Sequence, residues 1–285
     1  MSTVTDERPR LQSAIALVSA LGLGAGGLAL GFVLFIVVGA GIVAATGAGL
    51  PTFAVLVLSL VFVQGIGCGG VALGYYKLRP VIAPRIRAAL DISGDGRSFG
   101  IPVSVPTVRQ AGIVIIGYAA AIVWVMVSGI LLTVVQQIRG QSLNTGNNAA
   151  AELGQSNPEL LLLLIPASIL LIGPGEELLF RGVVQARLRE RFSRVPGIAI
   201  ASLFFAALHI VALVGGSLVG NLIVVSILFG TATVFGVAYE YADNIVVPSL
   251  IHGLYNATLF TLLYVSLTLG EELPQQGQAL LGLFL

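Results

Sequence analysis

Five ionisable side chains lie inside or at the edge of long apolar stretches of this chain. They are Glu176, Glu177, Arg181, His209 and His252, and the sequence contains no other histidine. Burying such groups is costly unless they are paired or have a task. We therefore expect them to form a functional site.

The two adjacent glutamates are predicted to do different things. Glu177 and Arg181 are four residues apart, so on a helix they share a face and can form an ion pair. Glu176 is rotated by about 100° from Glu177 and faces another direction, which leaves its carboxylate for another purpose. A salt bridge that only stabilises the helix is the simpler interpretation of the Glu177–Arg181 pair.

Each histidine has a partner four residues away, because Phe205 precedes His209 and Asn256 follows His252. A glutamate in apolar surroundings can accept a proton from water that a histidine helps to align. A second histidine and an amide can donate hydrogen bonds to the oxyanion of a tetrahedral intermediate. This set of residues is typical of amide hydrolysis, although a histidine bonded to a backbone carbonyl is the simpler alternative for either one alone.

The elements that must position these residues are membrane helices. Of the 285 residues, 56% are hydrophobic and only 9% are charged, against about 25% charged in soluble domains. A helix of about 20 apolar residues crosses a bilayer core of about 30 Å. The sequence predicts an all-α polytopic membrane bundle of about seven transmembrane helices, with eight as the alternative, and it excludes nucleic-acid binding. Charged residues are absent from 11–76, 110–138, 160–175, 195–239 and 244–270.

Glycine and proline divide these tracts into spans. The first tract breaks at 47–51, and the tract 195–239 breaks at 215–217. The predicted spans are 13–45, 52–76, 110–138, a helix from Pro158 past 173–175, two helices within 195–239, and 245–269. The predicted organisation begins with a tail at 1–12 and N-terminal transmembrane helices over 13–139. These helices include a loop at 77–109, which contains a short amphipathic helix near 81–91. A linker at 140–158, a catalytic core over 159–270 and a tail at 271–285 follow.

The basic residues predict the orientation of the bundle. Thirteen of the 14 Lys and Arg residues fall in the N-terminal tail, in 77–109 and in 181–194, and only Arg139 lies at the other end. Cytoplasmic loops of membrane proteins carry such an excess. We therefore predict a multi-pass protein of the cell membrane with its N-terminus in the cytoplasm and 140–158 outside.

Two glycine patterns imitate a dinucleotide-binding fingerprint. They are Gly22-x-Gly24-x-x-Gly27 and Gly65-x-Gly67-x-x-Gly70. Neither follows a strand or precedes an acidic residue at the required spacing. Close packing of membrane helices through small residues explains them better.

The ordered motifs resemble a known family. E-E-x-x-x-R at 176–181, F-x-x-x-H at 205–209 and H-x-x-x-N at 252–256 are similar to the three motifs of the CPBP family of intramembrane proteases. That family includes the type II CAAX prenyl endopeptidases and proteins linked to bacteriocin processing and immunity. The resemblance spans about 160–260, and each of the seven motif residues fits the pattern.

The resemblance implies a role for each motif residue. Glu176 would be the catalytic base, His209 would position the attacking water, and His252 with Asn256 would form the oxyanion hole. The supporting residues would be Glu177, Arg181 and Phe205. The substrate would be a membrane-anchored protein or peptide, lipidated as in CAAX proteins, within the bilayer.

Relatives have also been described as metallopeptidases. Glu176, His209 and His252 have the ligand types of a catalytic zinc site with a position open for water. Because H-E-x-x-H is absent, these ligands would come from three helices, and we favour a mechanism that requires no cofactor, with zinc as the alternative.

Other functions stay open at this stage. Buried Glu and His could relay protons in a proton-coupled transporter, although the two halves of the chain show no repeat. A non-catalytic membrane-embedded binding or immunity protein is a further alternative. The spacing also does not exclude Ser202 or Ser249 as a nucleophile.

The positions of the motif residues along their spans lead to a geometric prediction. Glu176, His209 and His252 lie at similar depth, to within about one helical turn. We expect their side chains and Asn256 to meet in one cavity that is otherwise apolar and opens toward the cytoplasmic half of the membrane.

Overall fold

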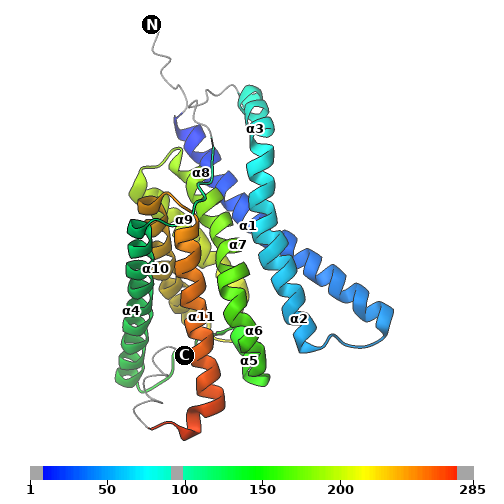
Figure 1. Cartoon of the computed structure of the whole chain (residues 1–285), viewed down its shortest axis with the longest axis vertical. Helices are drawn as coiled ribbons and strands as arrows, with labels where there is room; N and C mark the ends of the chain where they lie inside the picture. The colour runs from blue at the N-terminus through cyan, green and yellow to red at the C-terminus, as the bar shows by residue number, and fades with distance from the viewer. Residues whose placement is uncertain (1–8, 91–98, 275–285) are drawn as a thin grey trace.

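A computed structural model of the chain describes residues 9–90 and 99–274, and within these residues seven helices are long and apolar enough to cross a membrane. They form the predicted all-α bundle (Figure 1). Large apolar side chains face outward, such as Ile36 and Val37, each more than 60% exposed. A lipid surrounding accounts for such a surface. The seven helices run Arg10–Thr46, Thr52–Leu90, Val108–Arg139, Glu159–Arg189, Arg194–Ala212, Leu218–Ala242 and Val246–Leu269.

Several of these helices are built from successive segments, some of them π-helical or 3-10. The second contains α2 (Thr52–Ser59), the π-helical η1 (Leu60–Gly70) and α3 (Val71–Leu90). The fourth contains α6 (Glu159–Ala167), η2 (Ser168–Ile172), α7 (Gly173–Glu177), η3 (Leu178–Gln185) and α8 (Ala186–Arg189). The others are α1 (Pro9–Thr46), α4 (Val108–Arg139), α9 (Arg194–Leu208) with the 3-10 turn η4 (His209–Ala212), α10 (Leu218–Ala242), and α11 (Val246–Leu269) with the 3-10 turn η5 (Gly270–Glu272).

The predicted breaks at 47–51 and 215–217 are confirmed, but two predicted connections are wrong. The first is the loop at 77–109. The helix predicted near 81–91 is present up to Leu90, but it is the uninterrupted continuation of the second helix and not a separate element of a loop. Pro80 and Pro84 lie inside it, and each removes only one backbone hydrogen bond. Residues 91–98 lie outside the described part, and the chain is then extended up to the capping box that begins α4 at Thr107.

The second correction concerns 140–158, which is folded rather than a polar linker. It contains β1 (Asn147–Asn148) and α5 (Ala149–Ser156), and the Asn148 side chain caps α5 by accepting a hydrogen bond from the Ala150 backbone N–H. β1 pairs antiparallel with β2 (Leu213–Val214), which follows α9. Two connections that are distant in the sequence are thereby joined at one end of the bundle.

The predicted tails also differ from the structure. The first span begins at Pro9 instead of residue 13, so the predicted tail 1–12 is helical from Pro9 onward. Residues 1–8 and 275–285 lie outside the described part.

Glycines set the contact between α1 and η1, as the sequence predicted. A Cβ on Gly67 would lie 2.7 Å from the backbone oxygen of Gly27 and 3.0 Å from the Cα of Gly31. Any larger side chain would push the two helices apart. Gly22 has no neighbour within 4 Å of such a Cβ, so only part of each glycine pattern is used for packing.

The fourth helix lies between two groups of helices and carries the core (Figure 1). Its segments contact α1 and η1 on one side and α11 on the other, while α10 packs on α9 and α4. Leu179, Phe180, Val183 and Val184 of η3 are fully buried against α1, η1 and α9. Any side chain on the inner face of this helix is therefore held rigidly.

Candidate active site

Glu176 and Glu177 lie in α7, a single α-helical turn between two π-helical segments, and both side chains are buried. Two glycines just before the glutamates allow two neighbouring helices to pack closely against α7. A Cβ on Gly173 would lie 2.7 Å from the backbone oxygen of Ser249 in α11, and one on Gly175 would lie 2.7 Å from that of Gln64 in η1. The sequence G-P-G before the glutamates therefore brings α11 and η1 directly to the site.

The Glu176 carboxylate lies among three polar side chains from three other helices. Its Oε1 accepts a hydrogen bond of 2.9 Å from Gln64 Nε2. Its Oε2 lies 3.5 Å from His209 Nε2 and 3.8 Å from His252 Nε2, and has no hydrogen-bond partner among the described residues. The structure thus brings Glu176, His209 and His252 together, as the sequence predicted.

His209 lies at the point where α9 tightens into the 3-10 turn η4. Its Nδ1 lies 2.7 Å from the backbone oxygen of Phe205, and the two rings are 4.2 Å apart. A carbonyl only accepts hydrogen bonds, so Nδ1 carries the proton and Nε2 of neutral His209 is an acceptor directed at Glu176. Phe205 supports the histidine through both its ring and its backbone.

Glu177 belongs to a second buried group. Its Oε2 accepts a hydrogen bond of 3.0 Å from Arg181 Nε, so the predicted ion pair is confirmed, and both side chains are fully buried. Its Oε1 lies 2.9 Å from His252 Nδ1, a contact that the sequence did not predict. Phe235 stacks on the other face of His252 with ring centres 4.8 Å apart. Glu177 therefore holds Arg181 and His252 in place together.

A cavity of about 520 Å³ contains Glu176, His209, His252 and Asn256. Asn256 makes no hydrogen bond to any described residue, so its amide is available to a molecule in the cavity. Ser202 and Ser249 do not line this cavity, which argues against either as a nucleophile. Most of the other lining residues are apolar, as predicted.

The predicted direction of the cavity is wrong. It extends from Glu176 toward the end of the bundle that carries α5, β2 and the beginning of α2, and Asn148, Glu152 and Val214 line it there. This is the end opposite to most basic residues. The end of α1 lies apart from α5 and α6 (Figure 1), while Leu56 of α2 belongs to one buried cluster with Leu164 of α6. Toward the basic end, η3 and the α1–η1 contact close the bundle.

Comparison with known proteins identifies the part of the chain that contains this site. Residues 158–258 match the family model described as type II CAAX prenyl endopeptidase Rce1-like. This segment is therefore similar to that family. The resemblance predicted from the motifs is confirmed, since all seven motif residues lie within the matched range. No curated protein and no solved structure matches the chain.

The Rce1-like segment does not contain the whole site. Gln64 lies in η1, outside the matched residues, and contacts Glu176 directly. The sequence prediction missed it because it started from ionisable residues and their neighbours four positions away. The signal was a glutamine in the middle of the predicted span 52–76, where an amide without a partner would be costly.

The ligand types of a zinc site are present in the matched segment, and the Nε2 atoms of His209 and His252 lie 3.5 and 3.8 Å from Glu176 Oε2. A zinc ion held by these three residues would supply an activated water. The favoured cofactor-free mechanism and the zinc alternative both stay predictions, and the chemistry below is derived from the side chains of the chain.

Proposed function

We propose that the chain is an intramembrane endopeptidase that cleaves a peptide bond of a membrane-tethered or lipidated, CAAX-like substrate. The observation that carries this proposal is the buried Glu176 Oε2 atom, which has no hydrogen-bond partner among the described residues and lies within 4 Å of two histidine nitrogens in a largely apolar cavity. A water molecule bound there would face a base and two aligning groups. The family match of 158–258 supports the same class of reaction.

In the proposed reaction, water donates one hydrogen to Glu176 Oε2 and the other to Nε2 of neutral His209. Glu176 takes the first proton as the water oxygen attacks the carbonyl carbon of the substrate. It then returns this proton to the leaving amine as the C–N bond breaks. Gln64 holds Oε1 and so leaves Oε2 oriented toward the water.

Asn256 and His252 are proposed to stabilise the tetrahedral oxyanion. Asn256 can donate without any change of state. His252 directs Nδ1–H to Glu177, so it must also carry a proton on Nε2 to donate from that nitrogen. Glu176 and Glu177 together balance the charges of Arg181 and this imidazolium, which would be costly in an apolar site without counter-charges.

The lining of the cavity supports an apolar substrate chain. Leu28, Phe32 and Phe35 of α1 face Phe260 of α11 across it, and polar groups are concentrated near Glu176. A lipid chain or an unwound membrane segment would match these walls. The reacting bond would then lie beside the polar group formed by Glu176, His209, His252 and Asn256.

The decisive experiment is cleavage of a lipidated, membrane-tethered peptide by the purified full chain. We expect product from the wild type and a loss of about 10²–10⁴-fold in Glu176→Gln, which keeps the shape and removes the base. Asp243→Asn, at the end of α10, is a control outside the site. Equal turnover by wild type and Glu176→Gln would refute the proposal.

A further inference from the structure

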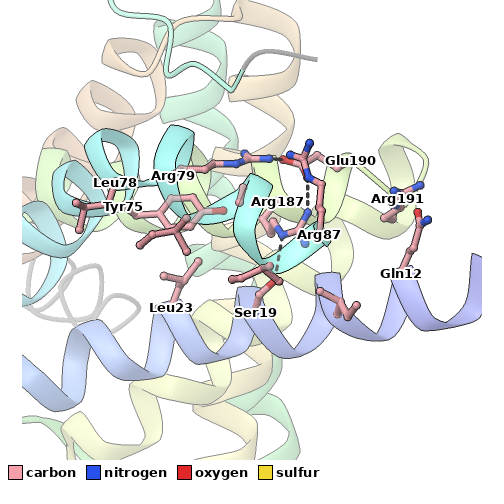
Figure 2. Close-up of a pocket in the computed structure, with 14 residues that line it drawn as sticks. Gln12, Ser19, Leu23, Tyr75, Leu78, Arg79, Arg87, Arg187, Glu190 and Arg191 are labelled. Carbon is pink, nitrogen blue, oxygen red and sulfur yellow. Dashed lines mark hydrogen bonds and ion pairs between the residues drawn. The ribbon is translucent and has the colours of Figure 1, made fainter. Parts of the chain in front are cut away.

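A second cavity, of about 360 Å³, lies at the other end of the bundle, between α1, α3 and α8 (Figure 2). It shares no lining residue with the cavity around Glu176. The proposed hydrolysis makes no use of it. Its walls combine arginines with branched apolar side chains, so a ligand that fits them would have both an anionic group and an apolar chain.

The described side chains around this cavity include several cations. Arg79, Arg87 and Arg187 line it, and Glu190 is the one carboxylate among the described lining residues. Glu190 forms ion pairs with Arg79 and Arg187, and Arg187 also donates to Ser19 of α1 (Figure 2). One carboxylate thus already serves two guanidinium groups, and the cavity would attract an anion.

Two of the arginines have guanidinium N–H groups that could donate hydrogen bonds to a ligand. Arg79 is only 6% exposed, and its Nη1 atom has no hydrogen-bond partner within the described residues. Arg87 is half-buried and forms no hydrogen bond or ion pair with any described residue. An unpaired guanidinium nitrogen this deeply buried is costly, so an anionic oxygen placed between the two would stabilise both.

The apolar part of the cavity continues onto the outside of the bundle. Leu78, Ile82 and Ile86 of α3 line it and are each between 44% and 56% exposed. On a membrane helix this outward face meets lipid. A ligand could therefore place an apolar chain against α3 while its charged part lies among the arginines.

The position of the cavity along the helix points to the same kind of ligand. The apolar tract of the second helix ends at Tyr76, and Lys77 and Arg79 follow. The arginines therefore lie where the hydrocarbon core gives way to lipid headgroups. Basic pockets between helices at this level are suited to anionic headgroups.

We propose that this cavity binds an anionic phospholipid, with the phosphodiester between Arg79 and Arg87 and an acyl chain that runs past Leu78 and Leu23 toward the hydrocarbon core. The lipid would connect α3 to α8, which ends the helix that carries Glu176. It would stabilise the closed, basic end of the bundle. The lipid site is independent of the proposed hydrolysis.

The test uses the purified full chain in a neutral detergent and measures lipid retention by native mass spectrometry together with the shift in melting temperature. The probes are phosphatidylglycerol, the zwitterionic phosphatidylcholine, and inorganic phosphate at equal concentration. The test variant is Arg87→Gln, which breaks no contact within the described structure. Its matched control is Arg85→Gln, an exposed arginine of the same helix that does not line the cavity.

We expect phosphatidylglycerol to bind more tightly than phosphatidylcholine and Arg87→Gln to weaken it about fivefold, with Arg85→Gln unchanged. Equal binding of both lipids, or equal losses in both variants, would overturn the proposal, because a general surface charge would then explain the result. Stabilisation by inorganic phosphate as large as that by phosphatidylglycerol would also overturn it, since a free anion would then suffice.

Discussion

Neighbouring residues of one helical turn take part in two different networks. Glu176 faces Gln64 and the Nε2 atoms of both histidines, whereas Glu177 faces Arg181 and the Nδ1 atom of His252. His252 is the residue that both carboxylates contact. One carboxylate oxygen of Glu176 is therefore available to a bound molecule, whereas both oxygens of Glu177 contact Arg181 or His252.

Glu177→Gln should destabilise the protein more than Glu176→Gln. It leaves Arg181 buried without its counter-charge, at a cost of about 3–5 kcal/mol if the pair is fully desolvated. Glu176→Gln removes a charge without breaking an ion pair to an arginine. Thermal unfolding in detergent should show a clearly lower midpoint only for Glu177→Gln, and similar midpoints for both variants would contradict this division of roles.

Cleavage should not depend on a metal ion. We expect the purified protein to keep its activity after prolonged treatment with a zinc chelator, because the proposed base and aligning groups are all side chains. A zinc-dependent peptidase treated in parallel is the control. Activity that disappears on chelation and returns with zinc would favour the alternative with Glu176, His209 and His252 as ligands.

The sequence predicted the polar residues of the site where their type was unusual for a membrane span. It missed Gln64 and the Glu177–His252 contact for physical reasons. A neutral amide is a weaker signal than a charge, and a pair 75 residues apart is set by how α11 crosses the fourth helix. Helical spacing reveals only partners within one helix.

At the scale of elements, the segments on either side of the glutamates depart from regular α-helix. η2 precedes α7 and η3 follows it, and η1 carries Gln64. π-helical turns are often found at functional sites because they redirect side chains within a helix. Composition does not reveal such turns, so the apolar tracts predicted the spans but not this local geometry.

The α1–η1 contact should tolerate no side chain at its centre. Gly67→Ala would place a Cβ 2.7 Å from the Gly27 oxygen, so we expect a loss of about 1–3 kcal/mol. Gly26→Ala is the matched control, because nothing lies within 4 Å of its Cβ. Both are measured by unfolding in detergent, and equal stability of the two variants would show that the contact is less tight than described.

Prolines and polar residues misled the prediction of two connections. Pro80 and Pro84 suggested a loop, yet the helix passes through both, as membrane helices tolerate. The polar stretch 140–158 suggested a linker, yet Asn148 caps a helix within it. Packing of α3 against η3 accounts for the first helix, and a local side-chain cap accounts for the second.

At the scale of the whole molecule, the orientation stays a prediction that labelling can test. In a Cys68→Ala background, Ala150→Cys should react with a membrane-impermeant maleimide in intact cells, and Arg85→Cys only after permeabilisation. The excess of basic residues at the α3 and α8 end gives this expectation. The opposite labelling pattern would invert the bundle.

The direction of the cavity was beyond prediction from sequence. The separation of the end of α1 from α5 and α6 depends on how the helices lean against one another (Figure 1). The sequence gives the depth of each residue along its span, and it predicted that the motif residues lie at one level. It does not show toward which end of the bundle the cavity extends.

This open end determines which compartment can supply the substrate. A protein lipidated in the cytoplasm would present its tail at the basic end, where Leu179, Val183 and the Gly27–Gly67 contact close the bundle. With the predicted orientation, the cavity instead receives chains that have already crossed the membrane or that lie in its outer leaflet. The protein would then act late in the life of its substrate, after export, and the same labelling that fixes its orientation would decide on which side of the membrane to search for that substrate.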